Sequence, residues 1–218
     1  MALIGLGAIG RAVLQGTDKA KGVTVTHALV RAAKRDDVQK RFGPHLKVVS
    51  ASDELPDDLD LIVECAGHDP VRTEIPALLR RGLDVAIVSV GALADTPCLD
   101  TLRSAAANGG ARLRVLPGAI GGIDGLAAAG PFLETVSYCA RKPPASWSGS
   151  PADETHDLKT ITEPTESLSG TARGAALALR DNAHGVAGGG RAGGGVVRGR
   201  GRGWGGAGGR GGGGGGGG

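Results

Sequence analysis

Glycines near the amino terminus form the pattern in this chain that is best suited to binding a cofactor. The hexapeptide GLGAIG, residues 5–10, follows a short apolar run and opens the helical pattern AIGRAVLQG. In a strand–turn–helix unit of this kind, Gly5 would allow the tight turn, Gly7 the approach of a pyrophosphate, and Gly10 close packing of helix on strand. The N–H groups near Ala8 and Ile9 would then point at the phosphates. We therefore predict dinucleotide binding; a ligand-free glycine turn is the weaker alternative.

The residue that would contact the adenosine ribose lies at the end of the second strand pattern. NAD-specific domains usually carry an acidic residue about 20 positions after the glycines. Here the segment HALVRAAKR offers Arg31 instead. An arginine at this place could pair with the 2′-phosphate of NADP, so NAD and NADP both stay open as cofactors. A solvated arginine at a strand end is an equal alternative.

The segment VECAGHDP comes at the end of a strongly apolar run, where open α/β sheets place their ligands. Cys65, Ala66 and Gly67 are expected to line the cofactor cleft, because small residues let the main chain come close. His68 is a candidate acid or base. A loop histidine that caps the next helix or faces solvent is the favoured interpretation. The segments SVGAL and LPGAIGGIDGL end later strands in a similar way, the second of them facing the nicotinamide end.

The remaining titratable residues form no recognisable catalytic or metal-binding motif. The other body histidines, His27, His45 and His156, are scattered and none belongs to an HExxH pattern. The three cysteines are widely spaced with no CxxC pair, which argues against a disulfide framework and a zinc site. No metal is expected, and a reducing, cytoplasmic location is favoured.

Short apolar runs alternate with helical patterns from residue 2 to about residue 115, as in a βαβ series. The runs LIVEC and VAIVSV are nearly continuous in apolar residues, which is typical of central parallel strands. Pro76 predicts that its helix starts near Ile75 or kinks there. Thr96 is a candidate N-cap with Pro97 as first helical residue. We predict a doubly wound parallel α/β sheet, a Rossmann domain, over residues 1–130.

The pattern changes after residue 130. TVSYCARKP predicts a strand, a polar segment follows, and GTARGAALALR predicts a short helix. Residues 131–184 are therefore interpreted as the start of a second, incomplete α/β catalytic domain. Residues 185–218 contain 22 glycines and five arginines among 34 residues, with no acidic side chain. Such a low-complexity tail is predicted to be disordered, because it cannot repay the entropy of ordering its backbone.

Charge separates the body from this tail. The chain holds 25 basic and 22 acidic side chains, so removing the five tail arginines leaves the body at 20 against 22, a formal charge of −2. The body is thus not a polyanion binder. The tail segment RGRGRGWGGAGGR could bind RNA through arginine and stacking tryptophan, which is a disfavoured alternative. No apolar run approaches the roughly 20 residues of a membrane-spanning helix.

Five motifs in order, GLGAIG, VECAGH, VSVGAL, LPGAIGGID and VSYCARKPP, make residues 1 to about 183 resemble the L-aspartate dehydrogenases. The resemblance implies NAD(P)-dependent oxidative deamination of L-aspartate to iminoaspartate for NAD biosynthesis, and a homodimer or larger oligomer. It also implies that Ala119 occupies a cofactor-binding position. His184 replaces the second asparagine of the family's motif GxAREAAxxxPKNANVAA, a residue that contacts the cofactor.

The departures from the family concern catalysis. The family's catalytic histidine lies beyond an alanine-rich helix and two strands that have no counterpart here, so no residue is assigned the acid/base role. Alanine codons GCG read in the other frames give arginine and glycine, so a frame error is our hypothesis for the tail. The alternatives are a catalytically inactive cofactor-binding fragment and nucleic-acid binding through the tail.

Overall fold

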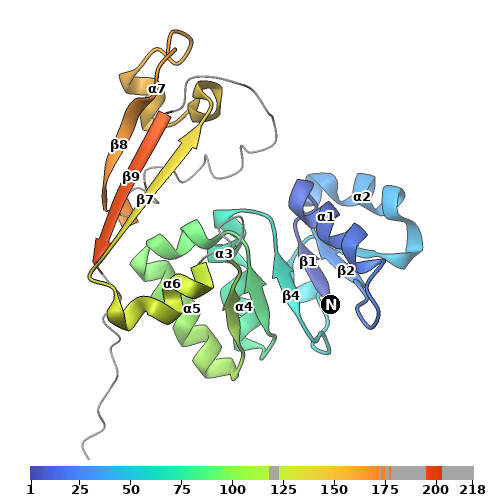
Figure 1. Ribbon diagram of the computed structural model, residues 1–218. Coiled ribbons are helices and arrows are strands. Elements are labelled where there is room, and N and C mark those ends of the chain that lie inside the picture. Colours follow the sequence, from blue (N-terminus) through green and yellow to red (C-terminus); the bar gives the residue numbers. More distant parts are fainter. Residues whose placement is uncertain (118–122, 172, 175–176, 178–194, 203–218) are drawn as a thin grey trace, which may run out of the picture.

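The computed structural model describes residues 1–117, 123–171, 173–174, 177 and 195–202 of the 218-residue chain. Two sheets organise these residues (Figure 1). The first has six strands in the order β3-β2-β1-β4-β5-β6, and the second has three in the order β7-β9-β8.

The first sheet is parallel throughout, as predicted. Its order runs outward in both directions from the neighbouring strands β1 and β4, which creates a switch point between them. Open α/β sheets bind ligands at the carboxyl ends of the strands at such a point. The strands are β1 (Ala2–Ile4), β2 (His27–Leu29), β3 (Lys47–Val49), β4 (Ile62–Glu64), β5 (Val85–Ile87) and β6 (Leu113–Val115).

Helices cover both faces of this sheet, and β1 shows how the sequence sorts them. Ala2 and Ile4 pack into one apolar cluster, whereas Leu3 between them packs into the other. This is the two-residue alternation of a strand that is buried on both sides. The first cluster includes α3 (His68–Thr73), α4 (Ile75–Arg80) and α5 (Thr96–Gly109); the second is covered by α1 (Ala8–Thr17) and α2 (Arg35–Phe42).

Prolines set two helix starts. Helix α4 begins at Ile75 with Pro76 in its first turn, so the prediction from Pro76 is confirmed. Helix α5 begins one residue earlier than predicted. Its N-cap is Asp95, whose backbone is extended, and Thr96 is already helical. Short 3-10 turns at Ala32–Lys34, Gly43–His45, Ser52–Glu54 and Val90–Ala94 complete the connections.

The second sheet follows α6 (Ile123–Ala129) and a 3-10 turn at Gly130–Phe132. Strand β7 (Thr135–Lys142) matches the predicted strand. A 3-10 turn at Pro144–Trp147 and α7 (Pro151–Thr155) then lead to β8 (Thr165–Thr171). Trp147 and Ala152 are buried, so this region has a small packed centre. Gly170 and Thr171 end β8 rather than starting the predicted helix, most of which lies outside the described residues.

Within the predicted low-complexity tail, the structure describes residues 195–202. They form β9 (Gly195–Arg202), which lies between β7 and β8, antiparallel to the first and parallel to the second. The sequence GVVRGRGR has no proline, and its two valines favour a strand. Ladder hydrogen bonds come from the main chain, so glycine does not prevent pairing. The other residues of 185–218 lie outside the described part of the chain.

Candidate functional site

The glycine turn joins β1 to α1 at the switch point. Gly5 has φ +88°, a conformation that favours glycine, and its N–H donates to the carbonyl oxygen of Leu29 at 2.9 Å. A Cβ on Gly5 would lie 2.7 Å from the Cβ of Ala66. The turn is therefore packed directly against the loop that follows β4.

The other two glycines of the motif differ sharply in their surroundings. A Cβ on Gly10 would lie 2.0 Å from the carbonyl oxygen of Gly5, so helix α1 packs against the turn without room for a side chain. Gly7 caps α1, and a Cβ there would meet nothing within 4 Å. Ala8 and Ile9 follow as exposed residues of the first helical turn. This open helix N-terminus is the arrangement that a pyrophosphate requires.

Arg31 lies at the carboxyl end of β2, two residues beyond its last residue, Leu29. It is exposed and leads into the 3-10 turn that precedes α2. Because β2 is the neighbour of β1, this arginine stands at the same edge of the sheet as the glycine turn. The place suits a group that contacts the adenosine ribose.

Cys65 follows β4 at the carboxyl end of the strand, where it is a packing residue. Its N–H donates to the carbonyl oxygen of Ile4 at 2.7 Å, and its side chain is buried in the core. Burial, followed by the neighbouring Glu64 charge, raises the pKa of the Cys65 thiol to about 11. A thiol of this pKa stays protonated at neutral pH, so Cys65 is not poised as a nucleophile.

Glu64 is the residue of this edge that the sequence reasoning missed. It is the last residue of β4 and is fully buried. Its carboxylate accepts hydrogen bonds from the N–H groups of Ala66, Gly67 and Ser89 and from the Ser89 hydroxyl, at 2.6, 2.8, 3.0 and 2.9 Å. An acid at the end of the apolar run LIVEC was the available signal. The carboxylate ties the loops after β4 and β5 together.

His68 opens α3 and is buried rather than facing solvent. The N-cap of α3 is Gly67, with φ +112°, so the histidine is one residue inside the helix. A Cβ on Gly91 would lie 2.6 Å from His68 Nε2, which places the imidazole against the turn after β5. The solvent-facing interpretation of His68 is therefore wrong, and the ring packs between the two loops.

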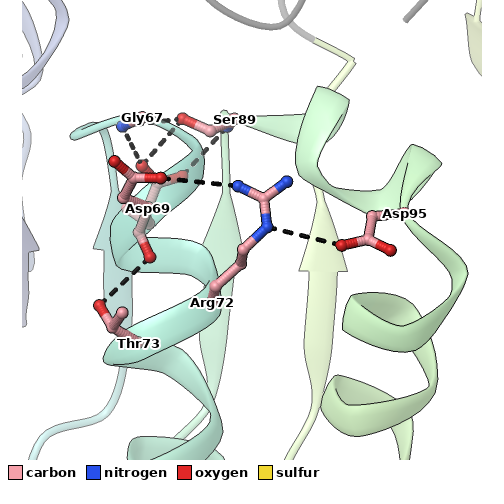
Figure 2. Close-up of polar contacts among 7 residues, drawn as sticks. Gly67, Asp69, Arg72, Thr73, Ser89 and Asp95 are labelled. Atoms are coloured by element: carbon pink, nitrogen blue, oxygen red, sulfur yellow. Dashed lines mark hydrogen bonds and ion pairs between the residues drawn. The ribbon is translucent and has the colours of Figure 1, made fainter. Parts of the chain in front are cut away.

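An arginine connects the same two loops farther from the turn. Figure 2 shows Arg72 of α3 between Asp69 and Asp95. Both ion-pair distances are 3.7 Å, from Nη1 to Asp69 and from Nε to Asp95. Since Asp95 caps α5, the arginine links α3 to the start of α5; the Asp95 side chain makes no cap hydrogen bond.

Two predicted cofactor residues, Ala119 and His184, lie outside the described residues. Within the residues that the structure does describe, no group of three His, Cys, Asp or Glu side chains could hold a metal ion. In the same part of the chain, no helix is long and apolar enough to cross a membrane.

A parallel doubly wound sheet, a glycine turn at its switch point and small residues on the adjoining loop define a nicotinamide-dinucleotide-binding domain of the oxidoreductase class. In agreement, the family model described as "Homoserine dehydrogenase, NAD binding domain" matches residues 5–116. The L-aspartate dehydrogenase of Ruegeria pomeroyi is 43% identical over 186 residues, and that of Ralstonia pickettii 37% over 187. This chain belongs to the L-aspartate dehydrogenase family, and its cofactor class is NAD or NADP.

These matches cover 84% of this chain, which spans 66% of the Ruegeria protein and 70% of the Ralstonia protein. The chain thus corresponds to about two thirds of the length of its relatives. The crystal structure of aspartate dehydrogenase from Thermotoga maritima has the same fold, with a TM-score of 0.55 at 20% identity. That comparison covers 92% of this chain and 77% of the Thermotoga chain.

Proposed function

We propose that this chain carries the cofactor-binding part of an enzyme that oxidatively deaminates L-aspartate to iminoaspartate with NAD or NADP. The observation that carries the proposal is the glycine turn. A side chain at Gly10 would have no room, whereas the space beside Gly7 is open. The aspartate dehydrogenases among the relatives supply the substrate. The bound cofactor would accept a hydride from Cα of aspartate, while the amine loses a proton to form the imine.

The chain's own residues would bind and orient the cofactor. The N–H groups at the start of α1, near Ala8 and Ile9, would hold the pyrophosphate. Arg31 would contact the ribose, and an added 2′-phosphate would give it an ionic partner. Cys65, Ala66 and Gly67 would line the cofactor cleft. Ala119 and His184 remain proposed cofactor contacts from the family resemblance.

No described residue is proposed as the general acid or base. His68 is buried against Gly91, and this packing gives it a structural role instead. A homo-oligomer and a cytoplasmic location remain proposals that rest on the family resemblance and the sequence alone.

A titration calorimetry experiment with NAD and NADP on the 218-residue chain tests the binding proposal. We expect saturable binding of at least one cofactor; no binding of either would contradict it. An assay for aspartate-dependent formation of reduced cofactor then tests turnover. If the chain binds cofactor but shows no aspartate-dependent formation of reduced cofactor, the deamination proposal is contradicted.

A further inference from the structure

The buried carboxylate of Glu64 is surrounded by hydrogen-bond donors from two loops. Its Oε1 atom accepts from the N–H of Ala66, the N–H of Gly67 and the hydroxyl of Ser89. Its Oε2 atom accepts from the N–H of Ser89 at 3.0 Å. Figure 2 shows Gly67 and Ser89 facing each other from the neighbouring loops after β4 and β5.

The direction of every one of these hydrogen bonds can be assigned. The Gly67 N–H also donates to the Ser89 hydroxyl oxygen at 3.1 Å, so the hydroxyl hydrogen is left for Glu64. The carboxylate thus acts only as an acceptor, as its ionised form does. None of the ion pairs found in the described part of the chain includes Glu64. Main-chain dipoles and one hydroxyl therefore compensate the charge.

Such an arrangement specifies conformation more than it adds stability. Buried charges carry a large desolvation cost, and apolar residues of similar size often serve a core equally well. Gly67 adopts φ +112°, and the carboxylate holds its N–H in that conformation. The neighbouring Ala66 is fixed at the same time, and it is the residue that contacts the Gly5 turn.

We infer that Glu64 is a positioning residue that holds the loops after β4 and β5 in their cofactor-binding conformation before the cofactor arrives. The inference rests on the proposed function, because that function places the Cys65–Gly67 loop against the cofactor. It assigns to Glu64 no contact with the cofactor itself. Its effect passes through Ala66 and Gly67 on one side and through Ser89 on the other.

The substitution Glu64→Gln changes the hydrogen bonding of this side chain while keeping its size, so it tests the positioning role without creating a cavity. A glutamine can keep its oxygen toward the three donors now at Oε1, but its NH₂ group would then face the N–H of Ser89, donor against donor. We expect the amide hydrogens of Gly67 and Ser89 to exchange at least about tenfold faster in the variant without cofactor. We also expect the Kd of the oxidised cofactor to rise by about tenfold.

Asp84→Asn is the matched control. Asp84 accepts from the N–H and Nε of Arg112 at 2.8 and 2.7 Å, immediately before β5 and β6, at the opposite edge of the sheet. This variant weakens a carboxylate–arginine ion pair at the amino-terminal ends of β5 and β6, whereas the glycine turn lies at the carboxyl ends of the strands. We expect it to lower Tm while leaving both the cofactor Kd and the exchange of Gly67 and Ser89 unchanged.

The outcomes distinguish the inference from the proposed function. If the unmodified chain binds neither cofactor, the proposed function fails, and with it the inferred link to cofactor binding. If the unmodified chain binds but Glu64→Gln binds equally well, the inference is overturned whatever the exchange rates. It is also overturned if the two carboxylate variants weaken binding equally, since loss of global stability would then explain both.

Discussion

The carbonyl oxygen of Gly5 occupies the space where residue 10 would carry a Cβ, 2.0 Å from its ideal position. Nothing flexible lies there, since the contact is with main chain. Gly10→Ala must therefore push α1 away from β1. We expect a loss of about 3 kcal/mol in the free energy of unfolding, measured by urea denaturation. A loss below about 1 kcal/mol would show that the helix adjusts without difficulty.

Gly7→Ala makes the opposite prediction at the same turn. Gly7 has φ −69°, which alanine adopts readily, and a Cβ there meets nothing within 4 Å. The free energy of unfolding should change by less than about 1 kcal/mol. Cofactor affinity should fall by about tenfold or more, because the methyl group would occupy the space proposed for the pyrophosphate. Unchanged cofactor affinity in calorimetry would show that the pyrophosphate does not bind beside Gly7.

Arg31→Ala tests cofactor choice. The arginine is exposed at the end of β2, where a 2′-phosphate would give it a charge-assisted hydrogen bond. We expect NADP to bind about tenfold more weakly to the variant, whereas the Kd of NAD should change little. Arg103→Ala is a suitable control, since Arg103 is an exposed arginine of α5 whose ion-pair partner, Asp100, lies in the same helix. Equal losses for both cofactors would mean that Arg31 does not read the 2′ position.

His27 predicts a pH dependence of stability. Burial, followed by the charge of Lys47, lowers the pKa of His27 from its ordinary 6.5. Between the lowered pKa of the folded chain and the ordinary pKa of 6.5, the unfolded chain binds more protons than the folded chain. The contribution of His27 to the free energy of unfolding is therefore fully present above pH 6.5 and is lost as the pH falls through 6.5 toward the folded-state pKa. Urea midpoints measured across this window should fall less steeply for His27→Gln than for the unmodified chain. Parallel profiles would contradict the assignment.

The sequence predicted the first sheet well because its strands are buried on both faces and its glycines have local roles. The LIVEC run and the GLGAIG turn each report their surroundings directly. Glu64 was missed because its partners, Gly67 and Ser89, come together only when β4 and β5 pair. His68 was misjudged for the same reason: Gly91, which covers its ring, is distant in sequence. Contacts across loops leave no periodic signal.

The glycine-rich composition of residues 185–218 does not predict strand β9. A high glycine content predicts disorder in a segment that has no partner, because ordering glycine costs much backbone entropy. Here the ordering partners already exist, since β7 and β8 offer main-chain groups on both sides of β9. Pairing on both sides gives the main chain of this glycine-rich segment its hydrogen-bond partners.

The central place of β9 leads to a test by truncation. Because β9 separates β7 from β8, removing residues 195–218 deletes the middle strand of the second sheet, whereas removing residues 203–218 leaves it whole. The longer deletion should expose the main chain of β7 and β8 and make residues 135–171 susceptible to limited proteolysis. The shorter deletion should leave the cleavage pattern of that region unchanged, and it serves as the control.

Cofactor affinity should survive both deletions, since the glycine turn and its neighbouring loops belong to the first sheet. Equal protection of residues 135–171 in both truncated chains would show that β9 does not hold the second sheet together.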